Sequence, residues 1–400
     1  MTYPTSVALL LNLLSLTGAL QNRIIIAATQ DSITLDARKV PLMMADAGAR
    51  TVSSREDLLC EECLLNSDMV EDLAAIGIQI VDPSCGATVT EVQSYLKKAE
   101  AVLNIVVKCD PDLEFYVEPL PTEFSGRGQQ SECTGGNPRL GTNGPGSSCQ
   151  QSLEIIRVGP AWQKLKQANK TVEVVLALLD GGVDTKHPDL INQFWKNPKD
   201  GSIGYNFASN TTYITDFNGH GTHCAGIAGA QINNSLGVAG AADNIKLMIL
   251  QIVDGDYPGM IHGTIGDIIR ALNFAVEHGA AVSLSSYAFH KKADTLKQAI
   301  VNAASKGHVY VTAAGNAGSS VDKVPVYPCV YAPDIPSMLC AAASTSDKDA
   351  PIDVASFSNV GSMVHIAAPG VQILSTYSTG RYWRQSGASM AAPISPLLLA

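Results

Sequence analysis

The sequence carries little charge, no cluster of basic residues and no hydrophobic run long enough to cross a membrane. Charged residues make up 16% of the chain, with 27 Lys and Arg against 37 Asp and Glu. The formal net charge of −10 argues against binding to nucleic acid or to anionic lipid. No window holds the about 18 uninterrupted apolar residues that a membrane helix needs, so we expect no stable membrane association.

Internal repeats are also lacking, and the composition is that of a folded protein. Hydrophobic residues make up 46% of the 400 residues, which is enough for two or three domains with apolar cores and excludes a chain disordered throughout. The nine cysteines are an odd number. In a chain that leaves the cytosol, they predict disulfides and at least one free thiol.

Residues 7–20 form an apolar stretch near the N-terminus that closes with small residues. This is typical of a signal peptide over residues 1–19, cut near Ala19. A buried helix or a membrane anchor stays open as an alternative, because no Lys or Arg precedes the stretch. We expect a secreted, extracellular protein. Three N-x-S/T acceptors fit a glycoprotein, at Asn169, Asn210 and Asn233.

Residues 20–120 and 121–150 differ in composition. Residues 21–120 hold 8 Lys and Arg and 17 Asp and Glu, a net charge of 8 − 17 = −9, with short β-type runs around helix-like stretches. This predicts a small, acidic α+β domain. Between Pro121 and Cys149, Gly, Pro and Ser make up 14 of 29 residues, which predicts an exposed, mobile linker with a processing site.

The part from 151 to 400 alternates apolar runs with helix-like periods. Four runs are apolar on both faces, at 172–179, 245–251, 280–285 and 308–314. Helices are predicted between the later runs, and they stop at Gly279 and Gly307. The pattern predicts an α/β fold with a doubly wound, mostly parallel sheet. In such a sheet, ligands bind at the carboxyl ends of the strands.

Residues suited to nucleophilic catalysis stand at these strand ends and helix starts. Asp180 closes the first run, His220 lies in GHGTH, and Ser389 lies in GASMAAP at the start of a last helix. A serine hydroxyl needs an imidazole to take its proton and a carboxylate to orient that imidazole. Asn316, in AAGNAG, offers an amide to a developing oxyanion. Singly, each residue could instead be a turn residue or a helix cap.

In this order the segments resemble the subtilisin-like (subtilase) serine endopeptidases. The family carries Asp, Gly-His-Gly-Thr-His, Ala-Ala-Gly-Asn and Gly-Thr-Ser-Met-Ala-x-Pro, which correspond here to Asp180, 219–223, 313–316 and 387–393. The resemblance implies that Asp180, His220 and Ser389 form the triad and that Asn316 is the oxyanion donor. It implies a structural role for His223. Two departures are Gly181 after the aspartate and Ala388 in place of the usual Thr.

The resemblance also implies residues that bind the substrate and an ion. SSYA (285–288) and AAGN look like the segments beside the substrate, which implies substrate-binding roles for Ser286, Ala288, Ala314 and Gly315. The segment 231–240 resembles the family's calcium loop. It implies Ca²⁺ held by Asp189, the side chain of Asn234 and the carbonyls of Ile232, Leu236 and Val238, with Gln150 or Gln151 closing the site. All-oxygen ligation with one carboxylate suits Ca²⁺, but a polar loop without an ion stays open.

The cysteines of the catalytic part and the acidic domain complete the expectations. Cys329 and Cys340 bracket a short loop with two prolines and are predicted to form a disulfide, whereas Cys224 is predicted to be a free, buried thiol. The acidic domain resembles the family's propeptide in position and size. The resemblance implies an intramolecular inhibitor whose extended tail occupies the substrate groove.

We therefore predict a secreted, monomeric serine endopeptidase, made as a zymogen, that acts on protein or peptide substrates. The alternative is a catalytically silent subtilisin-fold protein with a binding or inhibitory role. It arises because only 400 − 389 = 11 residues follow Ser389, fewer than in the family, and Pro396 would disturb the last helix.

Overall fold

The computed structural model describes residues 23–30, 33–35, 40–46, 60, 63–65, 70–81, 87–103, 105–116, 121, 133–168, 172–257, 260–347 and 351–398. The predicted signal peptide and the acceptor Asn169 lie outside these residues. By its contacts the chain divides into two units. Unit 1 comprises Met1–Glu114, Thr264–Asn273 and Lys292–Asn302, and unit 2 comprises the rest.

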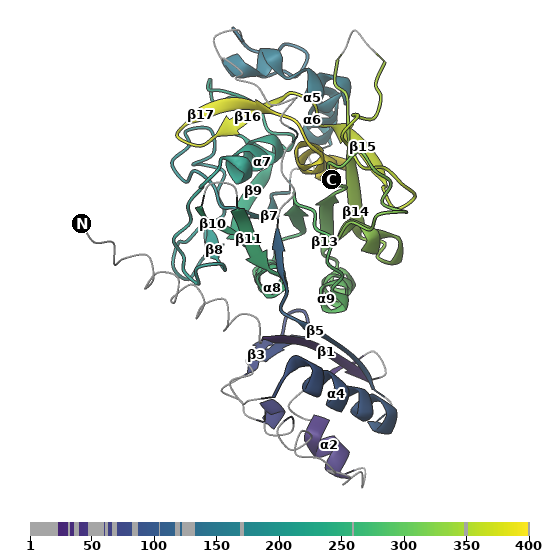
Figure 1. Cartoon of the computed structure of the whole chain (residues 1–400). Coiled ribbons are helices and arrows are strands. Elements are labelled where there is room, and N and C mark those ends of the chain that lie inside the picture. Colours follow the sequence, from purple (N-terminus) through teal and green to yellow (C-terminus); the bar gives the residue numbers. More distant parts are fainter. Residues whose placement is uncertain are drawn as a thin grey trace, which may run out of the picture. The chain divides into compact units, whose positions relative to one another are not determined.

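Unit 1 is built on an antiparallel sheet with the order β2-β1-β4-β3, to which β5 adds by pairing with β1. Its strands are β1 (Ile24–Gln30), β2 (Ile33–Leu35), β3 (Val70–Leu73), β4 (Ile78–Val81) and β5 (Val106–Pro111), and its helices are α2 (Val40–Asp46) and α4 (Val89–Leu103) (Figure 1). Helix α4 begins with a capping box, because Thr88 and Glu91 bond each other's backbone N–H. It buries Val92 and Leu96, four residues apart on one face, in a core with β1.

Unit 1 also contains a cluster of two arginines, two buried aspartates and the exposed Glu71. A guanidinium nitrogen of Arg23 lies 3.6 Å from a carboxylate oxygen of Glu71, and another lies 3.5 Å from one of Asp112. The guanidinium group of Arg270 lies 2.9 Å from a carboxylate oxygen of Asp267 and 3.8 Å from one of Glu71. The side chains of Asp112 and Asp267 are almost entirely buried. Burial raises the pKa of both carboxyls, against the opposing effect of the arginines.

Unit 2 is built on a seven-stranded sheet with the order β15-β14-β13-β12-β7-β9-β8, and its recorded strand pairs are all parallel. The strands are β7 (Val174–Asp180), β8 (Gly204–Asn206), β9 (Ile245–Gln251), β12 (Val282–Ser285), β13 (Val309–Ala313), β14 (Met338–Ser344) and β15 (Ile366–Pro369). Helix α7 (His220–Gly229) lies wholly in unit 2, whereas α8 (Ile265–Glu277) and α9 (Asp294–Ser305) each have their first part in unit 1 and their end in unit 2. The predicted α/β class is confirmed.

The strand order makes the sheet doubly wound. The chain passes from β7 to β9 in one direction along the sheet, and from β12 through β15 in the other. Because parallel crossovers are right-handed, the connecting helices cover opposite faces, and the winding reverses between β7 and β12, the position at which sheets of this kind bind ligands. On one face, Leu178 and Leu284 pack with Cys224 of α7 and Met390 in the main core.

Smaller elements surround the sheet. They are β6 (Glu114–Tyr116), β10 (Asp254–Tyr257), β11 (Met260–Thr264), β16 (Ile373–Tyr377), β17 (Arg381–Gln385), α5 (Gln151–Ile155), α6 (Val158–Gln167), α10 (Ala388–Ala391), η6 (Pro145–Cys149), η7 (Cys329–Asp334) and η8 (Ala392–Leu398). Strands β10, β11 and β6 form a three-stranded sheet, and β16 pairs with β17. Helix α10 is a single turn that passes into the 3-10 helix η8, inside which Pro396 lies. No helix within the described ranges is long and apolar enough to span a bilayer.

The prediction of an exposed, mobile linker is wrong for its second half, residues 133–149. Cys133 and Cys149 form a disulfide, and Leu140 packs with Leu153 and Trp162 in a small core. Gly and Pro permit tight turns here rather than disorder, since the segment has partners to pack against.

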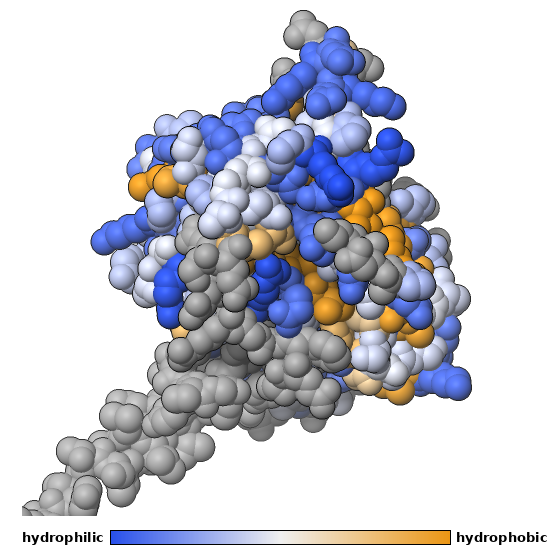
Figure 2. Space-filling model, turned by 90° about the horizontal axis from the view of Figure 1, so that it is seen from above, coloured by the Kyte–Doolittle hydropathy of each residue, from blue (hydrophilic) through white to orange (hydrophobic). Residues whose placement is uncertain are grey.

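The predicted Cys329–Cys340 disulfide is present, and Cys224 is a free, buried cysteine. The face drawn in Figure 2 is mostly hydrophilic, with hydrophobic residues gathered mainly in one region.

Candidate active site

Asp180 and His220 form a buried carboxylate–imidazole pair. Asp180 is the last residue of β7, and His220 is the first residue of α7. Nδ1 of His220 lies 2.8 Å from Oδ1 and 3.0 Å from Oδ2 of Asp180. An ionised carboxylate only accepts hydrogen bonds, so Nδ1 carries the proton and donates it to Asp180. The other nitrogen, Nε2, is thereby left as the basic atom.

Burial and the neighbouring side chains act in opposite directions on the pKa of His220. Burial is the largest single effect and disfavours the charged imidazolium, but the interactions with Asp180 and Cys224 together outweigh it and raise the pKa of His220 well above its ordinary value. The GHGTH turn is held by Asp216, which accepts from the backbone N–H of Gly219 at 2.7 Å and from the Thr222 hydroxyl. Gly219 has φ of +83°, and a Cβ there would lie 2.2 Å from the Tyr377 ring. Only glycine meets both conditions.

Ser389 lies beside this pair, linked to it through Cys224. The Cys224 sulfur lies 4.0 Å from each ring nitrogen of His220 and 3.5 Å from the carbonyl oxygen of Ser389. Among the described residues no hydrogen bond joins Nε2 of His220 to the Ser389 hydroxyl, a contact that is often loose in enzymes without substrate. The structure therefore places all three predicted triad residues in one site.

The same trio of Asp180, His220 and Cys224 could in principle hold a metal, since one ligand atom from each lies within 4.8 Å of the others. Metal binding needs a thiolate. Burial raises the pKa of the Cys224 thiol, which keeps it protonated. The acid–base interpretation of His220 fits the site better.

Asn316 lies on the other side of Ser389. Its side-chain oxygen accepts a hydrogen bond from the backbone N–H of Ala388 at 2.8 Å. The amide therefore presents its NH₂ group as the donor, beside the residue that precedes the nucleophile.

Of the two departures from the family pattern, Gly181 has a local explanation, and nothing in the structure explains the alanine at 388. A Cβ on Gly181 would lie 2.7 Å from the ring of Phe217, so the aromatic ring takes the place of the missing side chain. Ala388 uses its backbone N–H to orient Asn316. His223 is structural, as the sequence implies: it is fully buried, and Nε2 donates to the carbonyls of Ile373 and Trp383. Burial lowers its pKa to about 3, so it stays neutral.

The predicted substrate-binding residues lie at the ends of β12 and β13. Ser286 and Ala314 are fully buried, Gly315 has φ of +95°, and Ala288 packs against Val321 and Val326.

The sequence analysis does not predict an aromatic cluster that lies near these residues. Phe115 of β6, which is 1% exposed, packs on Tyr287 at 5.4 Å and on Phe289 at 5.2 Å between ring centroids. SSYA contains Tyr287, but nothing in the sequence relates it to Phe115.

The predicted calcium loop brings together three of its five residues. Asp189 is fully buried and accepts from the Asn234 amide at 2.6 Å and from the Val238 N–H at 2.9 Å. Burial raises the pKa of this carboxyl, and no Lys or Arg in the described ranges pairs with it. The carbonyls of Ile232 and Leu236 are close in sequence but make no recorded contact with it. In this arrangement the groups that face Asp189 are hydrogen-bond donors, and the oxygen ligands that Ca²⁺ takes are not gathered around the carboxylate.

Gln150, predicted as a closing ligand, is engaged elsewhere. Its amide donates to the carbonyl of Ala239 at 2.8 Å and accepts from the N–H of Ala239 at 2.7 Å. Gln151 starts α5 and is exposed. Neither residue contacts Asp189 in this arrangement.

Two of the predicted glycosylation acceptors make side-chain hydrogen bonds. The Asn233 side-chain oxygen accepts from the N–H of Asn143 at 3.1 Å, and that of Asn210 accepts from the Tyr205 hydroxyl at 2.8 Å.

Residues 171–395 match the model of the subtilase family, which is more than half of the chain. The chain belongs to the subtilase family. It is similar to thermitase of Thermoactinomyces vulgaris, with 36% identity over 247 residues that cover 62% of this chain and 79% of thermitase. It is also similar to the major intracellular serine protease of Bacillus subtilis (strain 168), with 34% identity over 247 residues, 61% of this chain and 71% of that protein.

A solved structure of a cold adapted subtilisin-like serine proteinase matches 55% of this subtilase and 71% of that chain, with 28% identity and a TM-score of 0.45. The family identifies the protein as a serine-type endopeptidase and confirms the resemblance drawn from the motifs.

Proposed function

We propose that this subtilase hydrolyses peptide bonds through Asp180, His220 and Ser389. The observation that carries the proposal is the hydrogen bond of His220 Nδ1 to Asp180, which leaves Nε2 basic beside the nucleophile. Nε2 takes the proton of the Ser389 hydroxyl as Oγ attacks the substrate carbonyl carbon. The C–N bond then breaks, and the leaving amine receives the same proton. Water hydrolyses the resulting acyl-enzyme by the reverse sequence of roles.

Asn316 would stabilise the negative oxygen that forms in the attack. One such donor is worth about 100- to 1,000-fold in kcat, a factor measured in a subtilisin and therefore in a relative of this chain. The orientation of its amide by Ala388 supports this role.

A fluorophosphonate probe tests the proposal, because it reacts only with an activated serine. The processed wild-type protein should be labelled at Ser389, and Ser389→Ala should not. A folded wild-type protein that stays unlabelled would instead support the silent binding or inhibitory protein.

Residues 20–120 would serve as an inhibitory propeptide of a secreted zymogen. Three contacts support this. Asp112 accepts from the N–H of Gly266 at 2.6 Å in the first turn of α8, and Asp110 accepts from the N–H of Thr295 at 2.6 Å in the first turn of α9. Strand β6 extends the β10–β11 pair and buries Phe115 against Tyr287 and Phe289. A strand that adds to a sheet edge with a buried side chain binds as an extended peptide substrate does.

Calcium would be held by Asp189, Asn234 and the carbonyl groups of 231–240. The ion would supply the positive charge that the buried carboxylate lacks, and so stabilise the loop. It takes no part in the chemical step.

A further inference from the structure

The segment that carries Asn316 has few hydrogen bonds within itself. It follows β13 and contains two glycines in left-handed conformations, Gly315 at φ +95° and Gly318 at φ +60°. No helix or strand includes residues 314–319, so other groups must satisfy its backbone. The position of the Asn316 amide depends on those groups.

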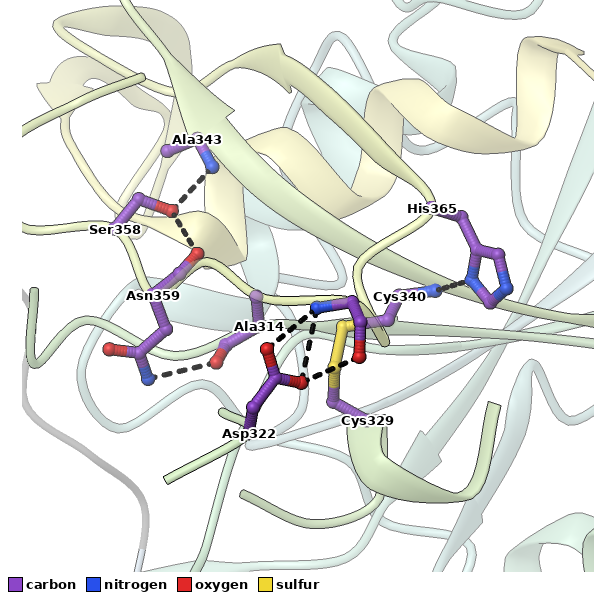
Figure 3. The surroundings of a disulfide bond; sticks show 9 residues. Ala314, Asp322, Cys329, Cys340, Ala343, Ser358, Asn359 and His365 are labelled. Atoms are coloured by element: carbon purple, nitrogen blue, oxygen red, sulfur yellow. Dashed lines mark hydrogen bonds between the residues drawn. A yellow bond between two sulfur atoms is a disulfide. The ribbon is translucent and has the colours of Figure 1, made fainter. Parts of the chain in front are cut away.

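The Asn359 side chain makes three of the hydrogen bonds to this backbone, and backbone groups of Ala341, Phe357 and Val360 make others. The Asn359 amide donates to the carbonyl of Ala314 at 2.9 Å, and its oxygen accepts from the backbone N–H of Ala317 at 3.1 Å and of Ser319 at 3.0 Å. The same oxygen accepts from the Ser319 hydroxyl at 3.1 Å. The backbone N–H of Asn359 donates to Gly315 at 3.0 Å. Figure 3 shows Asn359 reaching Ala314.

The assignment of the Asn359 amide is unambiguous. Its oxygen faces three donors and its nitrogen faces one carbonyl, so a flipped amide would set NH₂ against two backbone N–H groups. Asn359 is fully buried and its bond to Ala314 is shielded from water, whereas its bonds to Ala317 and Ser319 are partly buried. The contacts fall on both sides of Asn316 and leave its own side chain to meet Ala388.

We propose that Asn359 is a positioning residue for catalysis, which holds the 314–319 segment so that the Asn316 amide faces the developing oxyanion. The proposal rests on the proposed function, in which Asn316 is the donor. A displaced donor loses much of its effect, because a hydrogen bond to the oxyanion weakens as its distance and angle depart from the best geometry. This loss falls on the transition state, in which the oxyanion develops, and not on the bound substrate. Loss of Asn359 should therefore lower kcat and leave KM nearly unchanged.

The test compares Asn359→Ala and the isosteric Asn359→Asp with wild type on a peptide substrate, with kcat expressed per site titrated to completion by a fluorophosphonate. We expect about 10- to 100-fold lower kcat for Asn359→Ala, below the loss of the whole donor. KM should change less than about threefold. Asn359→Asp keeps the acceptor for 317 and 319 but cannot donate to Ala314, so its kcat should lie between those of wild type and Asn359→Ala.

A double-mutant cycle separates positioning from general support of the fold. In the Asn316→Ala background, Asn359→Ala should lower kcat by no more than about threefold, since the donor it positions is already absent. Ser358→Ala is the matched control, because this neighbour is also buried and accepts from the N–H of Ala343 at 2.8 Å (Figure 3). It should lower the melting temperature yet keep kcat within about twofold.

The inference is overturned if folded Asn359→Ala keeps kcat within twofold of wild type, or if its loss is the same with and without Asn316. Should Asn359→Ala not fold, the cycle is run with Asn359→Asp under the same criteria. Wild type that is not labelled refutes the proposed function instead, so the two failures are distinguishable.

Discussion

Acidification should stabilise unit 1, and Asp267→Asn should reproduce that effect at neutral pH. The reason lies in the cluster of charged residues described above, in which Asp112 and Asp267 are buried. Burial raises the pKa of Asp267 from 3.8 to about 6; Arg270 opposes the rise, and the Asp112 carboxylate adds to it. The side chain is only 9% exposed, so solvent screens it little.

The sign follows from proton linkage. The folded state binds the proton of Asp267 more tightly than the unfolded state, so its stabilising contribution is complete below about pH 4 and is lost as the pH rises through about 6. The gap between 3.8 and about 6 corresponds to about 3 kcal/mol. Lowering the pH from 7.5 to 4.5 should therefore increase the free energy of unfolding by about 2 kcal/mol. The pKa of Asp112 is also raised by burial, and its contribution has the same sign.

Native-state hydrogen exchange on the full chain measures the effect, with Ser389→Ala to prevent self-processing. The readout is the opening free energy of peptides that cover 105–116, at pH 7.5 and 4.5. Asp267→Asn should be more stable than its parent by up to about 3 kcal/mol at pH 7.5, and the difference should shrink to about 1 kcal/mol at pH 4.5. Glu277→Gln, at the far end of α8, should leave the pH dependence unchanged.

A destabilised Asp267→Asn at pH 7.5 would refute the reasoning. So would a difference that does not vary with pH. Either result would mean that the ionised pair of Asp267 and Arg270 gains more from attraction than it loses from burial.

Two further predictions concern the ion and the N-terminal part. Chelation with EDTA should lower the melting temperature of wild type but not of Asp189→Asn, because a ligand that binds only the folded state raises stability; equal shifts in both would exclude Asp189 as a ligand. Mass spectrometry of the secreted protein should find wild type beginning between 117 and 150 and Ser389→Ala beginning near residue 20, and identical N-termini would show that another protease removes the segment.

How far sequence reasoning reaches depends on how local the information is. The triad residues and Asn316 stand in short motifs at strand ends, and the apolar runs locate the parallel strands to within a few residues, as for β9 (Ile245–Gln251). Periodicity and motif spacing are properties of contiguous residues, so they can be read without knowing the fold.

Long-range contacts could not be read in this way. Asn359 bonds Ala314 across 45 positions, and Asp112 reaches Gly266 across 154. The 133–149 segment was predicted as a mobile linker because its composition is that of a loop, yet a disulfide and the burial of Leu140 hold it in place. The sequence by itself determined the family, the fold class and the reacting groups. Only the tertiary structure decided which distant side chains orient those groups, because such partners are chosen by packing and carry no local pattern.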